Sequence, residues 1–180
     1  RNKVIGAVAG AAIGGAVGYS MDNQVKEVAQ SLNTNVNNNP TAALDPNQDL
    51  IVSNTDNYVK IMFRDDMMFE TNSENPTYAA GTKIAKITTV LQKYPNTLVQ
   101  VVGHTDSRGT HAYNLALSEK RATNVGNIIN STGVQNQIFS KGCSFDKPIA
   151  LNNSDANMGL NRRVEVYLYP NQQSVIDVCR

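Results

Sequence analysis

The sequence predicts an α+β domain with helices packed on one face of a mixed sheet, preceded by an N-terminal Gly/Ala-rich helix. Three observations lead to this prediction. Short apolar runs mark strands, two longer stretches carry apolar residues at helical spacing, and glycine is concentrated at the start of the chain. The resulting element order, β-β-α-β-α-β-β, predicts right-handed connections that cross one face of the sheet.

Composition divides the chain into three segments: a glycine-zipper segment (1–21), a polar linker (22–48) and a folded domain (49–180). The stretch Val4–Ser20 is uncharged, and glycines recur in it every four residues, at Gly6, Gly10, Gly14 and Gly18. This spacing places them along one helical stripe, which lets another helix approach closely. The stretch is shorter than the roughly 20 residues that cross a bilayer. We expect self-association or membrane insertion, with a flexible leader as the alternative.

The linker prediction rests on polar, turn-forming residues. Residues 33–40 are rich in asparagine and end in Pro40, a composition that breaks a helix. Lys26, Glu27 and Gln30 could still continue the preceding helix. A polar tether of this kind separates an anchor from a working domain.

The folded domain contains apolar residues at both the two-residue spacing of strands and the three-to-four-residue spacing of helices. Strands are expected at Asp49–Ser53, Tyr58–Phe63, Leu98–Val102, Ile138–Ser140 and Val164–Tyr169. One amphipathic helix places apolar residues at helical spacing between Ala80 and Tyr94, and a second covers His111–Ser131 and ends before Gly133.

Charge and cysteine content limit the function classes. The 16 Lys and Arg residues nearly cancel the 15 Asp and Glu residues, giving a net charge of +1. This balance argues against a nucleic-acid partner bound by a basic surface. Cys143 and Cys179 are either one disulfide, as forms in an oxidising compartment, or two separate buried thiols.

The densest polar cluster lies where a strand meets a helix. It runs from Gly103 to Asn114 and continues along the helix to Ala122. An open sheet commonly binds ligands at this edge. Arg121 and Asp106, with Asn114 beside them, suit a zwitterion, because guanidinium grips a carboxylate and aspartate accepts from an ammonium. The alternative is a simple salt bridge between Asp106 and Arg121.

Several motifs in this region resemble a known family. They are Phe69-Glu-Thr-Asn72, Gly103-His-Thr-Asp-x-x-Gly109, Tyr113-Asn114, Leu117-Ser118, Arg121-Ala122, Gly142, Pro148-Ile149-Ala150 and Asn161-Arg-Arg-Val-Glu165. Across roughly Tyr58–Tyr169 the chain is similar to the OmpA-like peptidoglycan-binding domain of outer-membrane porins, peptidoglycan-associated lipoproteins and flagellar stator subunits. The resemblance implies a β-α-β-α-β sandwich.

The resemblance also implies a ligand, the diaminopimelate of the cell-wall stem peptide. Asp106 would hold its ammonium and Arg121 its carboxylate, with hydrogen bonds from Asn114 and Arg162. The remaining residues that the resemblance assigns are the loop residues Phe69, Glu70 and Thr71, and Leu117 as a wall. Two positions depart from the family: Glu70 replaces a common Asp, and Asn157-Met158-Gly159 lacks an arginine that usually braces this corner.

The same resemblance implies a location and partners. With its Gly/Ala segment, the chain looks like the glycine-zipper lipoproteins of the family. We expect a periplasmic protein, anchored to the outer membrane of a Gram-negative bacterium, that binds peptidoglycan and forms a homo-oligomer or part of an envelope complex. No cofactor is expected. Because the sequence starts at Arg1 rather than Met, we also expect residues upstream of it.

Three other interpretations compete with this one. The domain could be a periplasmic scaffold or a flagellar-motor component that mainly docks proteins, although Val4–Ser20 has no acidic residue for proton conduction. A wall hydrolase could use His104, Asp106, Ser107 and Ser118, but no nucleophile elbow is present. A metal site built from His104, Asp106, His111 and Cys143 matches no common ligand spacing. We therefore expect neither an enzyme nor a metal site.

Overall fold

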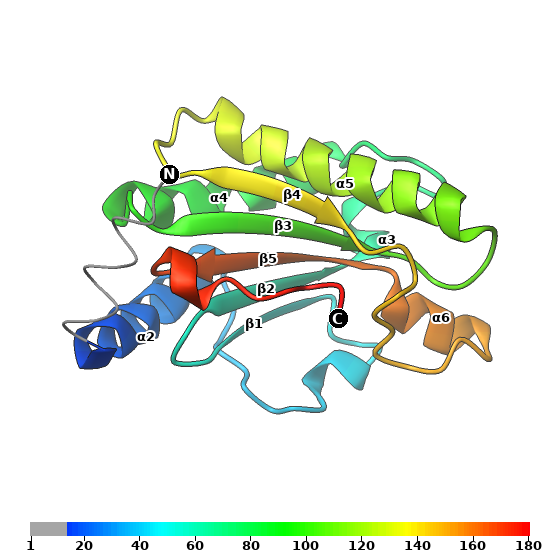
Figure 1. Cartoon of the computed structure of the whole chain (residues 1–180), viewed down its shortest axis with the longest axis horizontal. Helices are drawn as coiled ribbons and strands as arrows, with labels where there is room; N and C mark the ends of the chain where they lie inside the picture. The colour runs from blue at the N-terminus through cyan, green and yellow to red at the C-terminus, as the bar shows by residue number, and fades with distance from the viewer. Residues whose placement is uncertain (1–13) are drawn as a thin grey trace.

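The computed structural model describes residues 14–180, with side chains from Ser20 onwards. This part of the chain forms a five-stranded mixed sheet in the order β1-β2-β5-β3-β4, visible in Figure 1. The strands are β1 (Leu50–Asn54), β2 (Val59–Arg64), β3 (Leu98–His104), β4 (Ile138–Gly142) and β5 (Arg163–Tyr169). β3 and β4 are parallel, and the other neighbours are antiparallel.

Helices cover one face of this sheet. The long ones are α2 (Gly14–Ser31), α4 (Tyr78–Lys93) and α5 (His111–Ser131). Threonine caps begin the last two, since the Thr77 hydroxyl accepts from the Ala80 amide and the Thr110 hydroxyl accepts from the Tyr113 amide. The mixed sheet with its long helices on one face confirms the predicted α+β fold. The short helices α3 (Asp65–Met68) and α6 (Asp155–Asn161), and the 3₁₀ turns η1 (Ala42–Leu44) and η2 (Gln172–Ser174), complete the described elements.

Alternation along β5 explains how the two faces are packed. Val164, Val166 and Leu168 belong to the main apolar cluster beneath the helices. Tyr167 and Tyr169 face the other way and join a second cluster. Because all five side chains are buried, the second face must be covered as well.

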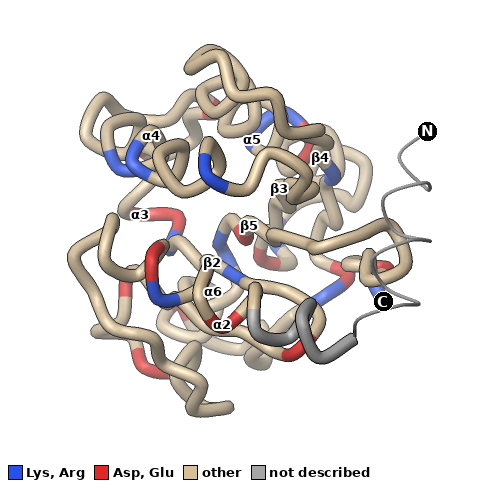
Figure 2. The backbone as a smooth tube through the Cα atoms, turned by 90° about the vertical axis from the view of Figure 1, so that its left-hand side faces the viewer, with Lys and Arg blue, Asp and Glu red and all other residues tan. Residues whose placement is uncertain are grey.

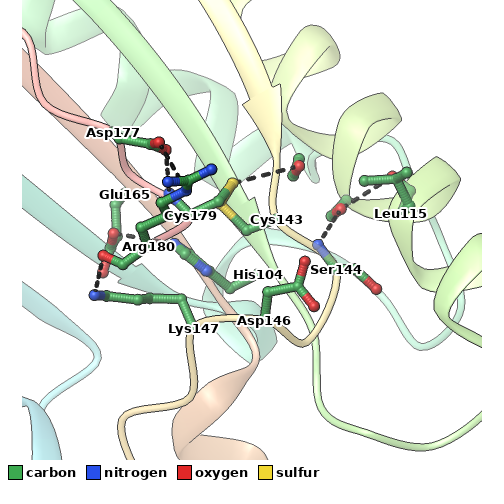
Figure 3. Close-up of a disulfide and its surroundings, with 12 residues drawn as sticks. His104, Leu115, Cys143, Ser144, Asp146, Lys147, Glu165, Asp177, Cys179 and Arg180 are labelled. Carbon is green, nitrogen blue, oxygen red and sulfur yellow. Dashed lines mark hydrogen bonds and ion pairs between the residues drawn. A yellow bond between two sulfur atoms is a disulfide. The ribbon is translucent and has the colours of Figure 1, made fainter.

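Two segments outside the helices provide that cover. Residues 42–43 pack against one end of the outer face, and the C-terminal segment crosses in front of β5 and β2 in Figure 1. A disulfide between Cys143 and Cys179, with Cα atoms 5.1 Å apart, fastens the C-terminal segment to the end of β4 (Figure 3). The question that the sequence left open is thus answered in favour of one bridge.

The predicted polar linker is wrong over residues 22–31. There α2 continues, and it buries apolar residues at helical spacing against the sheet and α4, at Met21, Val25, Val28 and Leu32. Residues further along also lie on the domain, since the Asn37 amide donates to the Val52 carbonyl at 2.8 Å. The reason is that 22–32 carries an apolar stripe that its many polar residues obscure.

The predicted glycine zipper falls partly outside the described residues. Gly14 and Gly18 belong to α2, whereas Gly6 and Gly10 precede the described part. Within residues 14–180, no helix combines the length and the apolar character needed to span a bilayer.

Candidate functional site

The candidate site is a hollow of about 390 Å³ at one end of the sheet. The C-terminal ends of β2 and β3 and the N-terminal end of β5 meet there, because Arg163 pairs in register with both Arg64 and His104. The chain leaving each of these ends supplies polar side chains. The lining residues are Asp65, Asp66, Thr71, Asn72, Thr105, Asp106, Arg108, Gly109, Tyr113, Asn114, Leu117, Arg121 and Arg162.

Asp106 lies in the loop after β3 and pairs with Arg162, just before β5. Its Oδ2 accepts from Arg162 Nη1 at 2.7 Å. Its Oδ1 accepts from the Arg108 amide at 2.9 Å, which closes a turn. Both carboxylate oxygens therefore have partners, one that shapes the loop and one that faces across the hollow.

Arg121 lies on α5 and is held from three sides. Nη1 pairs with the Asp65 carboxylate, and Nε donates to the Ser73 carbonyl at 2.9 Å. The guanidinium stacks over the Phe69 ring, with Cζ 4.5 Å from the centroid. The predicted alternative, a salt bridge between Asp106 and Arg121, does not form, because each residue binds a different partner.

The pair of Asp65 and Arg121 is largely buried, with 11% and 7% of the two side chains exposed. Burial raises the pKa of Asp65, while the charges of Arg121 and Arg162 act in the opposite direction. Asp65 is also linked to the neighbouring pair, since its amide donates to the Arg162 carbonyl at 3.0 Å. The two ion pairs thus form one connected group of charges.

Some of the other predicted site residues line the hollow, and others do not. Thr71 and Leu117 are among the residues that line it. Asn114 also lines it, but its Nδ2 donates to the carbonyls of Arg108 at 2.6 Å and Thr110 at 3.1 Å, so the amide mainly holds the loop.

Phe69 and Glu70 are not among the residues that line the hollow. Phe69 is buried beneath Arg121, and Glu70 is exposed to solvent. In the structure Phe69 therefore supports the Arg121 guanidinium, and Glu70 lies on the surface outside the lining of the hollow.

Sequence reasoning missed Asp65 and Arg108. Asp65 directly follows β2 and therefore lies at the same sheet edge as Asp106, a neighbourhood that requires knowledge of strand pairing. Arg108 contacts α6 through Met158 Sδ at 3.1 Å and Asp155 Oδ1 at 3.2 Å. It thereby connects the loop after β3 to α6 at the corner that contains Met158.

The residues of the hydrolase interpretation are not gathered at one point. His104 bonds through Nε2 to Glu165 Oε1 at 3.1 Å beneath the C-terminal segment (Figure 3). The Ser118 hydroxyl donates to the Leu115 carbonyl at 3.0 Å and accepts from the Ser144 amide at 3.0 Å. Among the residues of the metal-site interpretation, Cys143 forms the disulfide with Cys179. Only Asp106 of either set lines the hollow.

The environment of His104 is a buried ion cluster on the outer face of the sheet. Burial lowers the pKa of His104. Burial by itself would raise the pKa of Glu165, but Arg163 and the hydrogen bond from His104 hold it well below its ordinary value. Lys60 adds a further contact, with Nζ 3.3 Å from Glu165 Oε2.

A second hollow, of about 260 Å³, reaches this cluster from the side of residues 37–43. Its charged lining groups are Lys60, Arg163 and Glu165, and they bind one another. The Arg163 nitrogens are all engaged, with Glu165 and with the carbonyls of Asn161 and Lys147. The hollow near Arg121 is therefore the stronger candidate for ligand binding.

Charge at the candidate site is balanced. Three carboxylates and three guanidinium groups line it, from Asp65, Asp66, Asp106, Arg108, Arg121 and Arg162. Figure 2 views the molecule from the end opposite this site and shows acidic and basic positions interspersed along the backbone, with acidic positions at α3. Such a lining suits a ligand that carries both charges rather than a simple anion or cation.

Comparison with known proteins places these features in context. A model of the OmpA family matches residues 68–162, more than half of the chain. The probable lipoprotein YiaD of Escherichia coli (strain K12) is 36% identical over 103 residues, covering 57% of this chain and 47% of that protein. The peptidoglycan-associated lipoprotein of Buchnera aphidicola subsp. Baizongia pistaciae is 35% identical over 96 residues, covering 53% and 54% of the two chains.

Among solved structures, the cell wall anchor of the T6SS from Pseudomonas aeruginosa superposes with a TM-score of 0.64 at 25% identity. The match covers 80% of this chain and 97% of the anchor. This chain spans about half the length, or less, of the first curated relatives that it matches.

Proposed function

This chain belongs to the OmpA family, and on that basis we propose that it binds peptidoglycan non-covalently and tethers an envelope protein or assembly to the cell wall. The ligand is the zwitterionic end of the diaminopimelate side chain in the stem peptide. Arg121 receives its carboxylate, and Asp106 receives its ammonium. Arg162, Asn114, Thr71 and Leu117 complete the site.

The observation that carries the proposal is the pairing of opposite charges around one hollow. Asp106 and Arg121 both line it, and each is already oriented by a separate partner, Arg162 and Asp65 respectively. Preorganised charges lose little entropy when a ligand replaces or joins their partners. Charge-assisted contacts of this kind are about twice as strong as neutral hydrogen bonds.

The names of the relatives support the same class of function. One is a peptidoglycan-associated lipoprotein, and one similar structure is a cell wall anchor. We therefore place the protein in the periplasm, with an attachment to the outer membrane, and assign it binding rather than catalysis. The disulfide fits an oxidising compartment.

Co-sedimentation with purified peptidoglycan sacculi tests the proposal. The parent protein should pellet with sacculi, and Arg121→Ala and Asp106→Ala should remain in the supernatant. Lys120→Ala is the matched control for Arg121, because Lys120 is the preceding residue of α5, is exposed and does not line the hollow. Circular dichroism checks that each variant is folded.

Two outcomes would contradict the proposal. If both pocket variants pellet like the parent, the site is elsewhere. If the parent itself stays in the supernatant, the domain does not bind the wall, and docking of protein partners becomes the better account.

We further propose that the glycine zipper supplies self-association or a membrane contact. The support is the four-residue spacing of Gly6, Gly10, Gly14 and Gly18. Gly10→Leu should reduce the oligomer size measured by light scattering, because a leucine side chain fills the glycine groove. Unchanged oligomer size would remove this role.

A further inference from the structure

The buried carboxylate of Asp65 enters the proposed function only as the partner that orients Arg121, with no contact to the ligand. Its side chain lines the hollow together with Asp106, although it emerges from α3 rather than from the loop after β3. It pairs with Nη1 of Arg121, the residue assigned to the ligand carboxylate. Any anion that approaches Arg121 therefore also approaches the negative charge of Asp65.

The remaining contacts of Arg121 limit what it can offer. Nε is bonded to the Ser73 carbonyl, and the face of the guanidinium lies on Phe69. Neither Nε nor Nη1 is free for a ligand, and the Phe69 ring blocks one face. Arg121 is thus a fixed, largely neutralised cation, unlike an isolated arginine on a surface.

The side chains of Asp65 and Asp106 line the same hollow. The Asp65 amide bonds to the Arg162 carbonyl, and Arg162 binds the Asp106 carboxylate. Two acidic and two basic side chains, paired as Asp65 with Arg121 and Asp106 with Arg162, consequently line the same hollow. An ammonium placed against the two carboxylates would relieve their mutual repulsion and would release part of Arg121 for a carboxylate.

We propose that Asp65 determines the charge specificity of this site: it prevents Arg121 from accepting a lone anion and admits a carboxylate only when the same ligand brings an ammonium. Asp65 is a specificity-determining residue in this account, beside Asp106 as a second acceptor for the ammonium. The inference rests on the proposed function, because it presumes that the hollow binds the diaminopimelate end.

Adjacent aspartates provide a matched pair of variants. Asp65→Asn and Asp66→Asn each remove one negative charge from the lining, but only Asp65 is paired with Arg121. The probes are a soluble diaminopimelate-containing muropeptide and pimelate, which keeps the carboxylates and lacks the amines. Affinities for both probes are measured by calorimetry on the full chain.

For Asp65→Asn we expect muropeptide affinity to fall about tenfold, as expected for one lost charge-assisted contact. The same variant should bind pimelate about tenfold more tightly than the parent does, because Arg121 is no longer neutralised. Asp66→Asn should change either affinity by less than about threefold.

Equal behaviour of the two variants would overturn the inference, since a general change in site charge would then explain both. Loss of sacculus binding in Arg121→Ala together with equal behaviour of the two Asn variants would leave the proposed function standing and remove the role of Asp65. If neither the parent nor any variant binds sacculi or muropeptide, both are wrong.

A measurement on the unmutated protein covers the case in which Asp65→Asn does not fold. The carboxyl ¹³C resonance of Asp65 should shift when muropeptide is added and should stay in place when pimelate is added. A resonance that does not respond to bound muropeptide would contradict contact between Asp65 and the ligand.

Discussion

Asp106 accepts a hydrogen bond from the Arg162 guanidinium at 2.7 Å, although the two residues are 56 positions apart in the chain. The pair joins the loop after β3 to the start of β5. Antiparallel pairing of these two strands brings His104 opposite Arg163, and the next residues outward therefore meet over the end of the sheet. The site is thus a direct consequence of sheet order.

The two oxygens of Asp106 predict different effects of two substitutions. Asp106→Asn keeps an oxygen that can accept from the Arg108 amide, but it loses the charge that binds Arg162 and the ligand ammonium. It should abolish sacculus binding with little change in stability. Asp106→Ala should also lose the turn and about 1 kcal/mol of stability. Thermal unfolding and co-sedimentation separate the two effects, and normal pelleting of Asp106→Asn would show that the charge is dispensable.

The disulfide predicts sensitivity to reductant. Closing the loop between Cys143 and Cys179 contributes about 3–4 kcal/mol on the chain-entropy model. Urea unfolding with and without a phosphine reductant should differ by about this amount in the parent. A Cys143→Ala/Cys179→Ala variant should be insensitive to the reductant. Identical unfolding curves for the reduced and oxidised parent would mean that the C-terminal segment is held by its packing alone.

His104 predicts a dependence of stability on pH. Its pKa is lowered by burial in the folded state, whereas an unfolded histidine titrates near 6.5. As the pH falls below about 6.5, His104 binds a proton in the unfolded chain but not in the folded protein. The free energy of unfolding therefore decreases.

His104→Gln can keep the bond to Glu165 and should flatten this decrease between about pH 7 and pH 5, as measured by chemical denaturation. The raised pKa of Asp65 acts with the opposite sign. It is present in both proteins, so the difference between them isolates His104. Equal slopes in parent and variant would contradict the assignment.

Two glycines predict opposite effects of the same substitution. A Cβ at Gly142 would lie 2.4 Å from the Glu119 amide nitrogen, so Gly142→Ala must push α5 away from β4. We expect it to destabilise the fold by about 1–3 kcal/mol. A Cβ at Gly81 meets only Ile128 Cδ1, at 3.8 Å, and Gly81→Ala should stabilise α4 by about 0.5–1 kcal/mol. Urea titrations measure both, and a neutral Gly142→Ala would contradict the tight contact.

The elements that the sequence predicted are those with a clear period. His111–Ser131 has the helical bounds expected from its apolar spacing and the following Gly133. The five strands were all located, with ends shifted by a residue or two. Short helices such as α3 escaped because four residues cannot display a helical period.

The features that the sequence did not predict have a common physical cause: they depend on contacts between segments that are distant in the chain. The run of asparagines after α2 indicated a free tether, but the apolar stripe before it packs on the sheet, and Asn37 bonds to the backbone of β1. Likewise, Arg121 and Asp106 line the same hollow, while the ion-pair partner of Arg121, Asp65, comes from a distant segment that only sheet pairing brings close. Local composition does not report such contacts.

The most direct test of the account compares two muropeptides that differ only in the stem-peptide residue, diaminopimelate in one and lysine in the other. Lysine keeps the ammonium and lacks the carboxylate that Arg121 is assigned to bind. Calorimetry should show at least about tenfold tighter binding of the diaminopimelate peptide. Equal affinities for the two peptides would contradict recognition of the zwitterion at this site.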